Sequence, residues 1–191
     1  MINKPKIVFL LCSMFSLGDV YAESTRECTP ILEATLQNVM VYRSTVYDKS
    51  VNECIPNESS YIKTKSSDST LNFDGFVTGL NIEYFPDLRK AYAVRSKIGA
   101  HTTTLFYFQV SEKDGKLTKL GEDFVSSLDR ISTYHLLNMF YVQVLNEKHE
   151  DDCYIMENDR YVYNSSGFRK MSSYEVIEFC EKDLKSLAEP H

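Results

Sequence analysis

The densest group of side chains that could bind a metal or transfer a proton is an acidic run near residue 150. Its members are Glu147, His149, Glu150, Asp151 and Asp152, directly before Cys153. Carboxylate and imidazole groups are suitable metal ligands, and paired carboxylates can perform acid–base catalysis. The run lies between two segments with strand patterns, where charged residues normally face water. We therefore interpret it as a solvated turn.

A second polar group begins at His101 and continues through three threonines, after Gly99-Ala100. This order predicts the tip of a turn that leads into a strand. The chain contains no Gly-x-Ser-x-Gly sequence that could present a nucleophile. We therefore predict that the protein is not an enzyme. The candidate contacts to a protein partner are Gly99, Ala100, His101, Thr102 and Tyr107.

Four of the five cysteines lie beyond the N-terminal segment, namely Cys28, Cys54, Cys153 and Cys180. An even number of cysteines without a Cys-x-x-Cys pair favours disulfides over metal ligation. Three pairings are possible for four cysteines. The spacing favours Cys28 with Cys54 and Cys153 with Cys180.

The N-terminal segment has the features of a signal peptide. Lys4 and Lys6 precede an apolar stretch from Ile7 to Phe15, and Val20-Tyr21-Ala22 ends in the small residue that signal peptidase requires. The apolar stretch is much shorter than the roughly 20 residues of a membrane span, and no later stretch approaches that length. We predict a signal peptide over residues 1–22 and one disulfide-tied domain over residues 23–191, located in the periplasm or secreted.

The amino-acid composition limits both the kind of partner and the class of fold. The formal net charge is −6, which argues against nucleic acid or an anionic membrane as partner. Tyr (13) and Phe (11) are abundant and Trp is absent. Aromatic residues at this density suit half-buried strands, so the composition indicates a β-rich protein.

Alternating and aromatic-rich segments predict many short strands. These segments are 39–47, 76–84, 91–97, 103–111, 131–146, 153–157 and 161–163. Asp114-Gly115 joins an aromatic strand to residues 117–120 and is the strongest hairpin signal. Residues 31–36 could be a short helix or a first strand. The polar stretch 48–70 is predicted to be a loop.

Turn residues recur towards the end of the chain. Residues 157–160 are predicted to join the two strands on either side of them, and Asn164 to Gly167 predicts another turn. Ser172 with Glu175 has the spacing of a capping box, and apolar residues up to Leu187 follow helical spacing. The predicted fold is mainly β, an antiparallel hairpin meander that is propeller-like or a sandwich, with a short C-terminal helix.

Residues 70–165 carry a weak family resemblance. The segment Gly79 to Asp87 resembles the Asp-Leu-Asn-x-Asp-Gly-x-x-Asp loop of FG-GAP and VCBS-type β-repeats and of small periplasmic lysozyme inhibitors. Such proteins continue with a strand, a Gly-Ala turn, an aromatic strand and a turn ending in Gly-Lys-Phe. Here Ala91 to Val94, Gly99-Ala100, Leu105 to Phe108 and Asp114 to Leu117 follow in that order.

The resemblance bears on calcium, because the loop binds this ion in some β-repeats. Asn81, Glu83 and Asp87 could supply oxygen ligands. Gly79 stands where the first Asp belongs, and Tyr84 where the sharp turn needs Gly. The loop is therefore predicted to serve as a turn without a cofactor, with calcium as the alternative.

Together these features favour an exported inhibitor or immunity-type protein that binds and blocks a lysozyme-like peptidoglycan hydrolase. An acidic protein suits a basic hydrolase, because complementary charge speeds encounter. The first alternative is a structural or adhesive module of the cell envelope. The second is a secreted hydrolase that uses Glu83, Asp87 or the acids of residues 147–152.

Overall fold

The computed structural model describes residues 27–87, 89–164 and 167–180. Within these ranges every regular element is a β-strand, so the prediction of a mainly β protein is confirmed. The predicted signal peptide at residues 1–22 lies outside the described residues. The described part of the chain contains no helix that could cross a membrane.

The strands form three antiparallel sheets. The N-terminal sheet contains β1 (Ile31–Leu36), β2 (Val39–Asp48), β3 (Glu53–Thr64) and β4 (Ser67–Asp74), in that order. The central sheet contains β5 (Phe76–Tyr84), β6 (Lys90–Ile98), β7 (Thr102–Val110), β8 (Leu117–Lys119) and β9 (Phe124–Ser126). The C-terminal sheet contains β10 (Arg130–Leu136), β11 (Met139–Glu150), β12 (Cys153–Asn164) and β13 (Gly167–Cys180).

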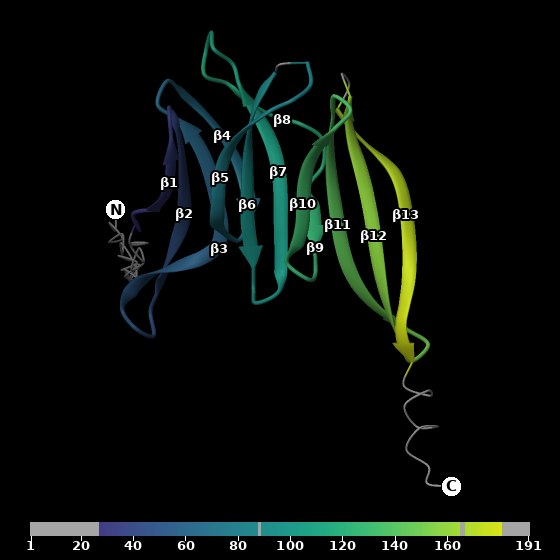
Figure 1. The fold of residues 1–191 in the computed structure, drawn as a ribbon. Coiled ribbons are helices and arrows are strands. Elements are labelled where there is room, and N and C mark those ends of the chain that lie inside the picture. The colour runs from purple at the N-terminus through teal and green to yellow at the C-terminus, as the bar shows by residue number, and fades with distance from the viewer. Residues whose placement is uncertain (1–26, 88, 165–166, 181–191) are drawn as a thin grey trace, which may run out of the picture.

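Within each sheet nearly every strand pairs with its neighbours in sequence, as the predicted hairpin meander requires. The exception is β9, which joins β8 in pairing with β7, so that these two short strands share the fourth position of the central sheet. The three sheets stand in a row, with the central sheet between the other two (Figure 1). This is the propeller-like alternative, in which successive four-stranded sheets stack face to face.

Each face of the central sheet packs against a neighbouring sheet. Tyr92, Val94, Phe106, Phe108 and Leu117 pack against Val39, Val41 and Ile62 of the N-terminal sheet. Ala91, Ala93, Leu105, Tyr107 and Phe124 pack against the C-terminal sheet, where the buried partners are Ile131, Phe140, Val142, Val144 and Tyr163. Because both faces are covered, β6 and β7 each contain a continuous apolar run, Ala91 to Val94 and Leu105 to Phe108.

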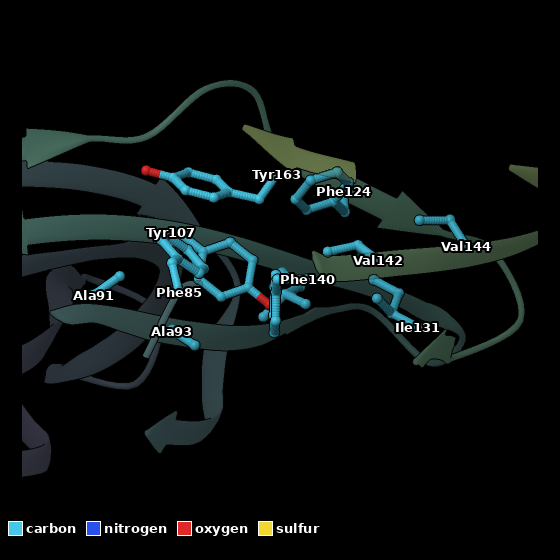
Figure 2. Close-up of a cluster of buried hydrophobic side chains, with 11 residues drawn as sticks. Phe85, Ala91, Ala93, Tyr107, Phe124, Ile131, Phe140, Val142, Val144 and Tyr163 are labelled. Atoms are coloured by element: carbon cyan, nitrogen blue, oxygen red, sulfur yellow. The ribbon is translucent and has the colours of Figure 1, made fainter. Parts of the chain in front are cut away.

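Phe85 fills the centre of the second core (Figure 2). It comes from the loop between β5 and β6, and its ring centroid lies 3.9 Å from that of Tyr163 and 5.6 Å from that of Tyr107. The loop that resembles a calcium-binding turn therefore contributes an aromatic side chain to the core.

The single strand predicted over residues 131–146 is instead the β10–β11 hairpin, and three further predictions about individual elements are wrong. Residues 48–70 do not form a loop, because β3 and β4 pair there. Buried polar side chains concealed this strand: Ser60 Oγ donates to the carbonyl of Gly75 at 2.6 Å, and Thr64 Oγ1 donates to that of Gly115 at 3.0 Å. Residues 157–160 do not turn, because they lie inside β12.

The predicted C-terminal helix is the third correction. Residues 172–180 belong to β13 and pair along β12 as far as Cys180. Ser173 Oγ donates to Asp159 Oδ1 on β12 at 2.6 Å, so this part of the chain bonds across the sheet. The remainder of the predicted helix, residues 181–187, lies outside the described residues.

Both disulfides have the pairing that the spacing favours, Cys28 with Cys54 and Cys153 with Cys180. Cys54 follows the β2–β3 turn, and Cys153 follows the β11–β12 turn. The β6–β7 turn lies at this same end of the stack, the lower end in Figure 1. We call it the His101 end.

Candidate functional site

The β6–β7 turn presents three exposed residues, Gly99, Ala100 and His101. Ile98 and Thr102 form the last strand pair before the turn, and the next residue along β7, Thr103, is buried. The turn therefore projects directly from the end of a packed sheet. Gly99 has a φ of 63°, a left-handed conformation that glycine adopts at little cost. The turn predicted from Gly99-Ala100 is therefore present and exposed, with Thr102 half-buried at its base.

A groove of about 570 Å³ opens beside this turn. It is lined by Lys97, Ala100, His101, Ser127, Leu128, Asp129, Glu147, Lys148 and His149. We call it the His101 groove. It brings together the His101 turn and the first part of the acidic run. These two groups lie more than 40 residues apart in the sequence, where each was identified as a separate candidate.

Three charged side chains of the His101 groove, those of Lys97, Asp129 and Lys148, are paired. Lys97 Nζ lies 3.5 Å from Asp129 Oδ2, and Thr103 Oγ1 donates to Asp129 Oδ1. The Thr103 hydroxyl and then Lys97 lower the pKa of Asp129 below its ordinary value. Asp129 therefore carries its negative charge throughout the neutral range.

Lys148 is held in a similar way. Its Nζ lies 2.5 Å from Glu175 Oε1 and 3.4 Å from Glu150 Oε1. The hydrogen bond to Glu175 is the main cause of a raised pKa for Lys148. The groove thus presents fixed charges of both signs next to the exposed imidazole of His101.

Hydrogen bonds fix the wall of the groove opposite the turn. The backbone N–H of Ser127 donates to Asn146 Oδ1 at 2.8 Å, and that of Glu147 donates to Ser127 Oγ at 3.0 Å. These bonds hold the β9–β10 link against β11. The Cys153–Cys180 disulfide joins β12 to β13 just beyond this wall.

Tyr107 is the one predicted contact that must be corrected. It lies on β7 with no exposed surface and packs in the second core (Figure 2). Burial raises its pKa well above the ordinary value. The aromatic strand that contains Tyr107 belongs to a central sheet covered on both faces.

The acidic run is divided by the structure. Glu147 and His149 line the groove, whereas Asp151 and Asp152 form the exposed β11–β12 turn with φ of 49° and 61°. Glu150 is paired with Lys148. The interpretation of the run as a solvated turn is confirmed for its second half.

The geometry at Asn81, Glu83 and Asp87 does not favour calcium. Asp87 accepts a hydrogen bond from Arg89 Nε at 2.5 Å, which lowers the pKa of the carboxyl. Asn81 and Glu83 lie on β5 and pair with Ala93 and Ala91. Among the described residues, no group of three or more His, Cys, Asp or Glu side chains could hold a metal ion.

The sequence did not reveal a second groove of about 640 Å³ at the opposite end of the stack. There Lys90 Nζ lies 5.0 Å from the ring centroid of Tyr92, and the Tyr92 hydroxyl donates to Gln37 Oε1 at 2.9 Å. Its lining comes from four separate turns and adjoining strand ends, which no local motif connects.

Comparisons with protein-family models, curated protein sequences and solved structures found no match to this chain. The part of the chain that the structure describes is a disulfide-linked β protein of three stacked antiparallel sheets, and this defines its class. The two disulfides indicate an oxidising compartment.

Proposed function

We propose that this chain is an exported inhibitor or immunity-type protein that binds a lysozyme-like, cell-wall-degrading enzyme and blocks its cleft. The observation that carries the proposal is the exposed His101 turn, which lies at the same end of the molecule as both disulfides and beside a groove with charges of both signs. A projecting turn is complementary in shape to the concave cleft of a hydrolase. A short turn whose base is paired at Ile98 and Thr102 also loses little conformational entropy on binding.

The residue types in the turn suit this role. Gly99 and Ala100 have little or no side chain, so their backbone N–H and C=O groups are accessible to a partner. The His101 imidazole adds a hydrogen-bonding group that can also carry a charge. Lys97 and Asp129 beside the turn would form the polar rim that surrounds most protein interfaces.

The net charge of −6 favours a basic partner. Charge complementarity accelerates association and disfavours partners of the same sign. The proposed target is therefore a basic peptidoglycan hydrolase. Localisation in the periplasm or outside the cell belongs to this proposal.

The test uses the full chain, expressed with its own N-terminal segment and purified with both disulfides formed. It is titrated against a panel of basic lysozymes and amidases, with complex formation measured by calorimetry and inhibition measured by peptidoglycan hydrolysis. We expect one enzyme to form a stoichiometric complex and to lose activity. A His101→Ala/Thr102→Ala double variant should bind that enzyme at least about tenfold more weakly, about 1.4 kcal/mol.

His135→Ala is the matched control, since His135 is an exposed histidine near the opposite end of β10. It should leave affinity unchanged. Equal affinities of the double variant and the wild type would remove the His101 turn from the interface. Absence of any complex across the panel would reject the inhibitor function and favour the envelope-module alternative.

A further inference from the structure

The two end sheets of the stack each have one outer face that points away from the central sheet. On the N-terminal sheet this face carries Leu32, Met40, Tyr42 and Tyr61, and we call it the Tyr42 face. On the C-terminal sheet it carries Tyr134, Leu136, Met139 and Tyr141, and we call it the Tyr141 face. Leu32, Leu136 and Met139 are 53%, 54% and 44% exposed, so each face combines exposed apolar side chains with tyrosine rings.

The Tyr42 face repeats a buried feature of the central sheet. Tyr42 on β2 is paired with Tyr61 on β3, and the rings stack with centroids 5.3 Å apart at 18°. In the central sheet, Tyr92 on β6 is paired with Phe108 on β7, with centroids 5.2 Å apart at 16°. Both pairs join the second and third strands of their sheets and point in the same direction along the stack.

The environments of the two pairs differ. Tyr92 and Phe108 are only 3% and 0% exposed, because the N-terminal sheet covers them. The covering surface includes the β1–β2 hairpin, in which Ala34 pairs with Val41 and Leu36 pairs with Val39. Tyr42 and Tyr61 remain half-exposed, with no equivalent hairpin over them among the described residues.

The equivalent hairpin surface exists at the other end of the same chain. In β10–β11, Tyr134 pairs with Tyr141 and Leu136 pairs with Met139. The registers match those of β1–β2 across turns of the same length, at residues 37–38 and 137–138. The Tyr141 face is thus the counterpart, in the C-terminal sheet, of the surface that covers Tyr92 and Phe108.

Ring orientation indicates which kind of partner fits. Tyr134 and Tyr141 stack on each other, with centroids 5.2 Å apart at 13°. Each ring therefore turns one of its flat sides to its neighbour, and that side is closed to a sugar or a base that would stack on it. Tyr92 and Phe108 have this same geometry and are covered by another sheet.

From this equivalence we propose that the Tyr42 face of one copy of this chain packs on the Tyr141 face of a second copy. The contact continues the sheet-on-sheet packing within the chain. It joins two different surfaces and is therefore heterologous. Two copies contribute six sheets, within the roughly four to eight blades that closed propellers use. This inference does not depend on the proposed function.

The test is the oligomeric state of the full, oxidised chain by sedimentation equilibrium. We expect the wild type to associate, and Tyr42→Lys and Tyr141→Lys each to be monomeric under the same conditions. An equimolar mixture of the two variants should recover association, because it still offers one intact face of each kind. Tyr84→Lys is the control, since Tyr84 is 60% exposed at the end of β5 and belongs to neither face.

Leu136→Lys, at a 54% exposed position, provides a second variant of the Tyr141 face if Tyr141→Lys does not fold. Circular dichroism verifies the fold of each variant. A wild type that stays monomeric at every concentration would overturn the proposal. Persistent dimers of a folded Tyr42→Lys or Tyr141→Lys variant would also overturn it. Each variant lacks one of the two proposed faces, so such a dimer would have to form through the other face alone.

Discussion

The carboxylate of Asp159 on β12 bonds to two side chains of β13 and so helps to hold residues 167–180 as a strand. Its side chain is 10% exposed and lies 2.7 Å from Lys170 Nζ, and Ser173 Oγ donates to it at 2.6 Å. Burial alone would raise the pKa of Asp159, but the hydrogen bonds from Lys170 and Ser173 lower it overall. The folded state therefore favours the charged form, and both partners lie on β13.

Asp159→Asn should reduce the free energy of unfolding by about 1–2 kcal/mol at pH 7. A carboxyl whose pKa is lowered by folding contributes stability above its unfolded value, and loses that contribution as the pH falls through the folded value. The difference between variant and wild type should therefore shrink as the pH falls below the ordinary pKa of 3.8 and vanish below the lowered pKa of the folded state. Urea denaturation across this pH range measures it.

Asp123→Asn is the matched control. Lys119 and Asp123 also approach to 2.7 Å, but their side chains are 34% and 36% exposed. Water screens such a pair, so this variant should lose no more than about 0.5 kcal/mol. A pH-independent effect at Asp159 would show that its charge does not hold β13.

One residue, Gly75, makes the connection between the first two sheets. It lies between the end of β4 and the start of β5, with a φ of 89°. Its N–H donates to the carbonyl of Glu58 at 2.6 Å, and its carbonyl accepts from Ser60. A Cβ at this position would lie 2.4 Å from the backbone oxygen of Lys97 on β6. The link is therefore packed on both sheets.

Gly75→Ala should destabilise the protein by at least about 2 kcal/mol, because the left-handed backbone is strained and the methyl group meets backbone. Gly99→Ala is the control, with a φ of 63° and open space for 4 Å around the position that a Cβ would take. It should cost about 1 kcal/mol from backbone strain alone. Thermal unfolding compares the two, and equal losses would mean that the link tolerates a side chain.

The hairpins were predictable where local turn chemistry and apolar alternation agree, as at Asp114-Gly115 and in β5 and β6. Prediction failed where a strand depends on a partner far along the chain. Ser60 and Thr64 look like loop residues until their hydrogen bonds to Gly75 and Gly115 are known. Ser172 and Glu175 have the spacing of a helix cap, yet pairing with β12 determines the structure.

The candidate site was predictable only in pieces. The exposed turn at His101 follows from Gly99-Ala100, and both cysteine pairs follow from spacing. The proximity of His101 to Glu147 and His149 does not follow from the sequence, because it arises from the packing of two sheets. The exclusion of Tyr107 is different, because the continuous apolar run Leu105 to Phe108 is itself typical of a strand covered on both faces.

For the molecule as a whole, both disulfides lie near turns of the His101 end. One disulfide belongs to the N-terminal sheet and the other to the C-terminal sheet, the two sheets that have only one neighbour in the stack. Covalent links thus reinforce the outer sheets, and packing on both faces holds the central sheet.

Cys153→Ser/Cys180→Ser should lower the free energy of unfolding by about 3 kcal/mol, as expected for a loop of this length. The sequence separation is 27 residues, against 26 for Cys28 and Cys54, so the corresponding N-terminal double variant should lose a similar amount. Denaturant unfolding without reductant compares both with the wild type. Unchanged stability in either variant would contradict a structural role for that bond.

The order of strands also determines how the chain can reach this structure. Each sheet is built from one uninterrupted stretch of sequence, so its backbone pairing needs only short loop closures. Low contact order of this kind favours rapid folding. During synthesis, the N-terminal sheet could therefore form before the residues of the C-terminal sheet are available. Docking of the preformed sheets would then be the last step of folding.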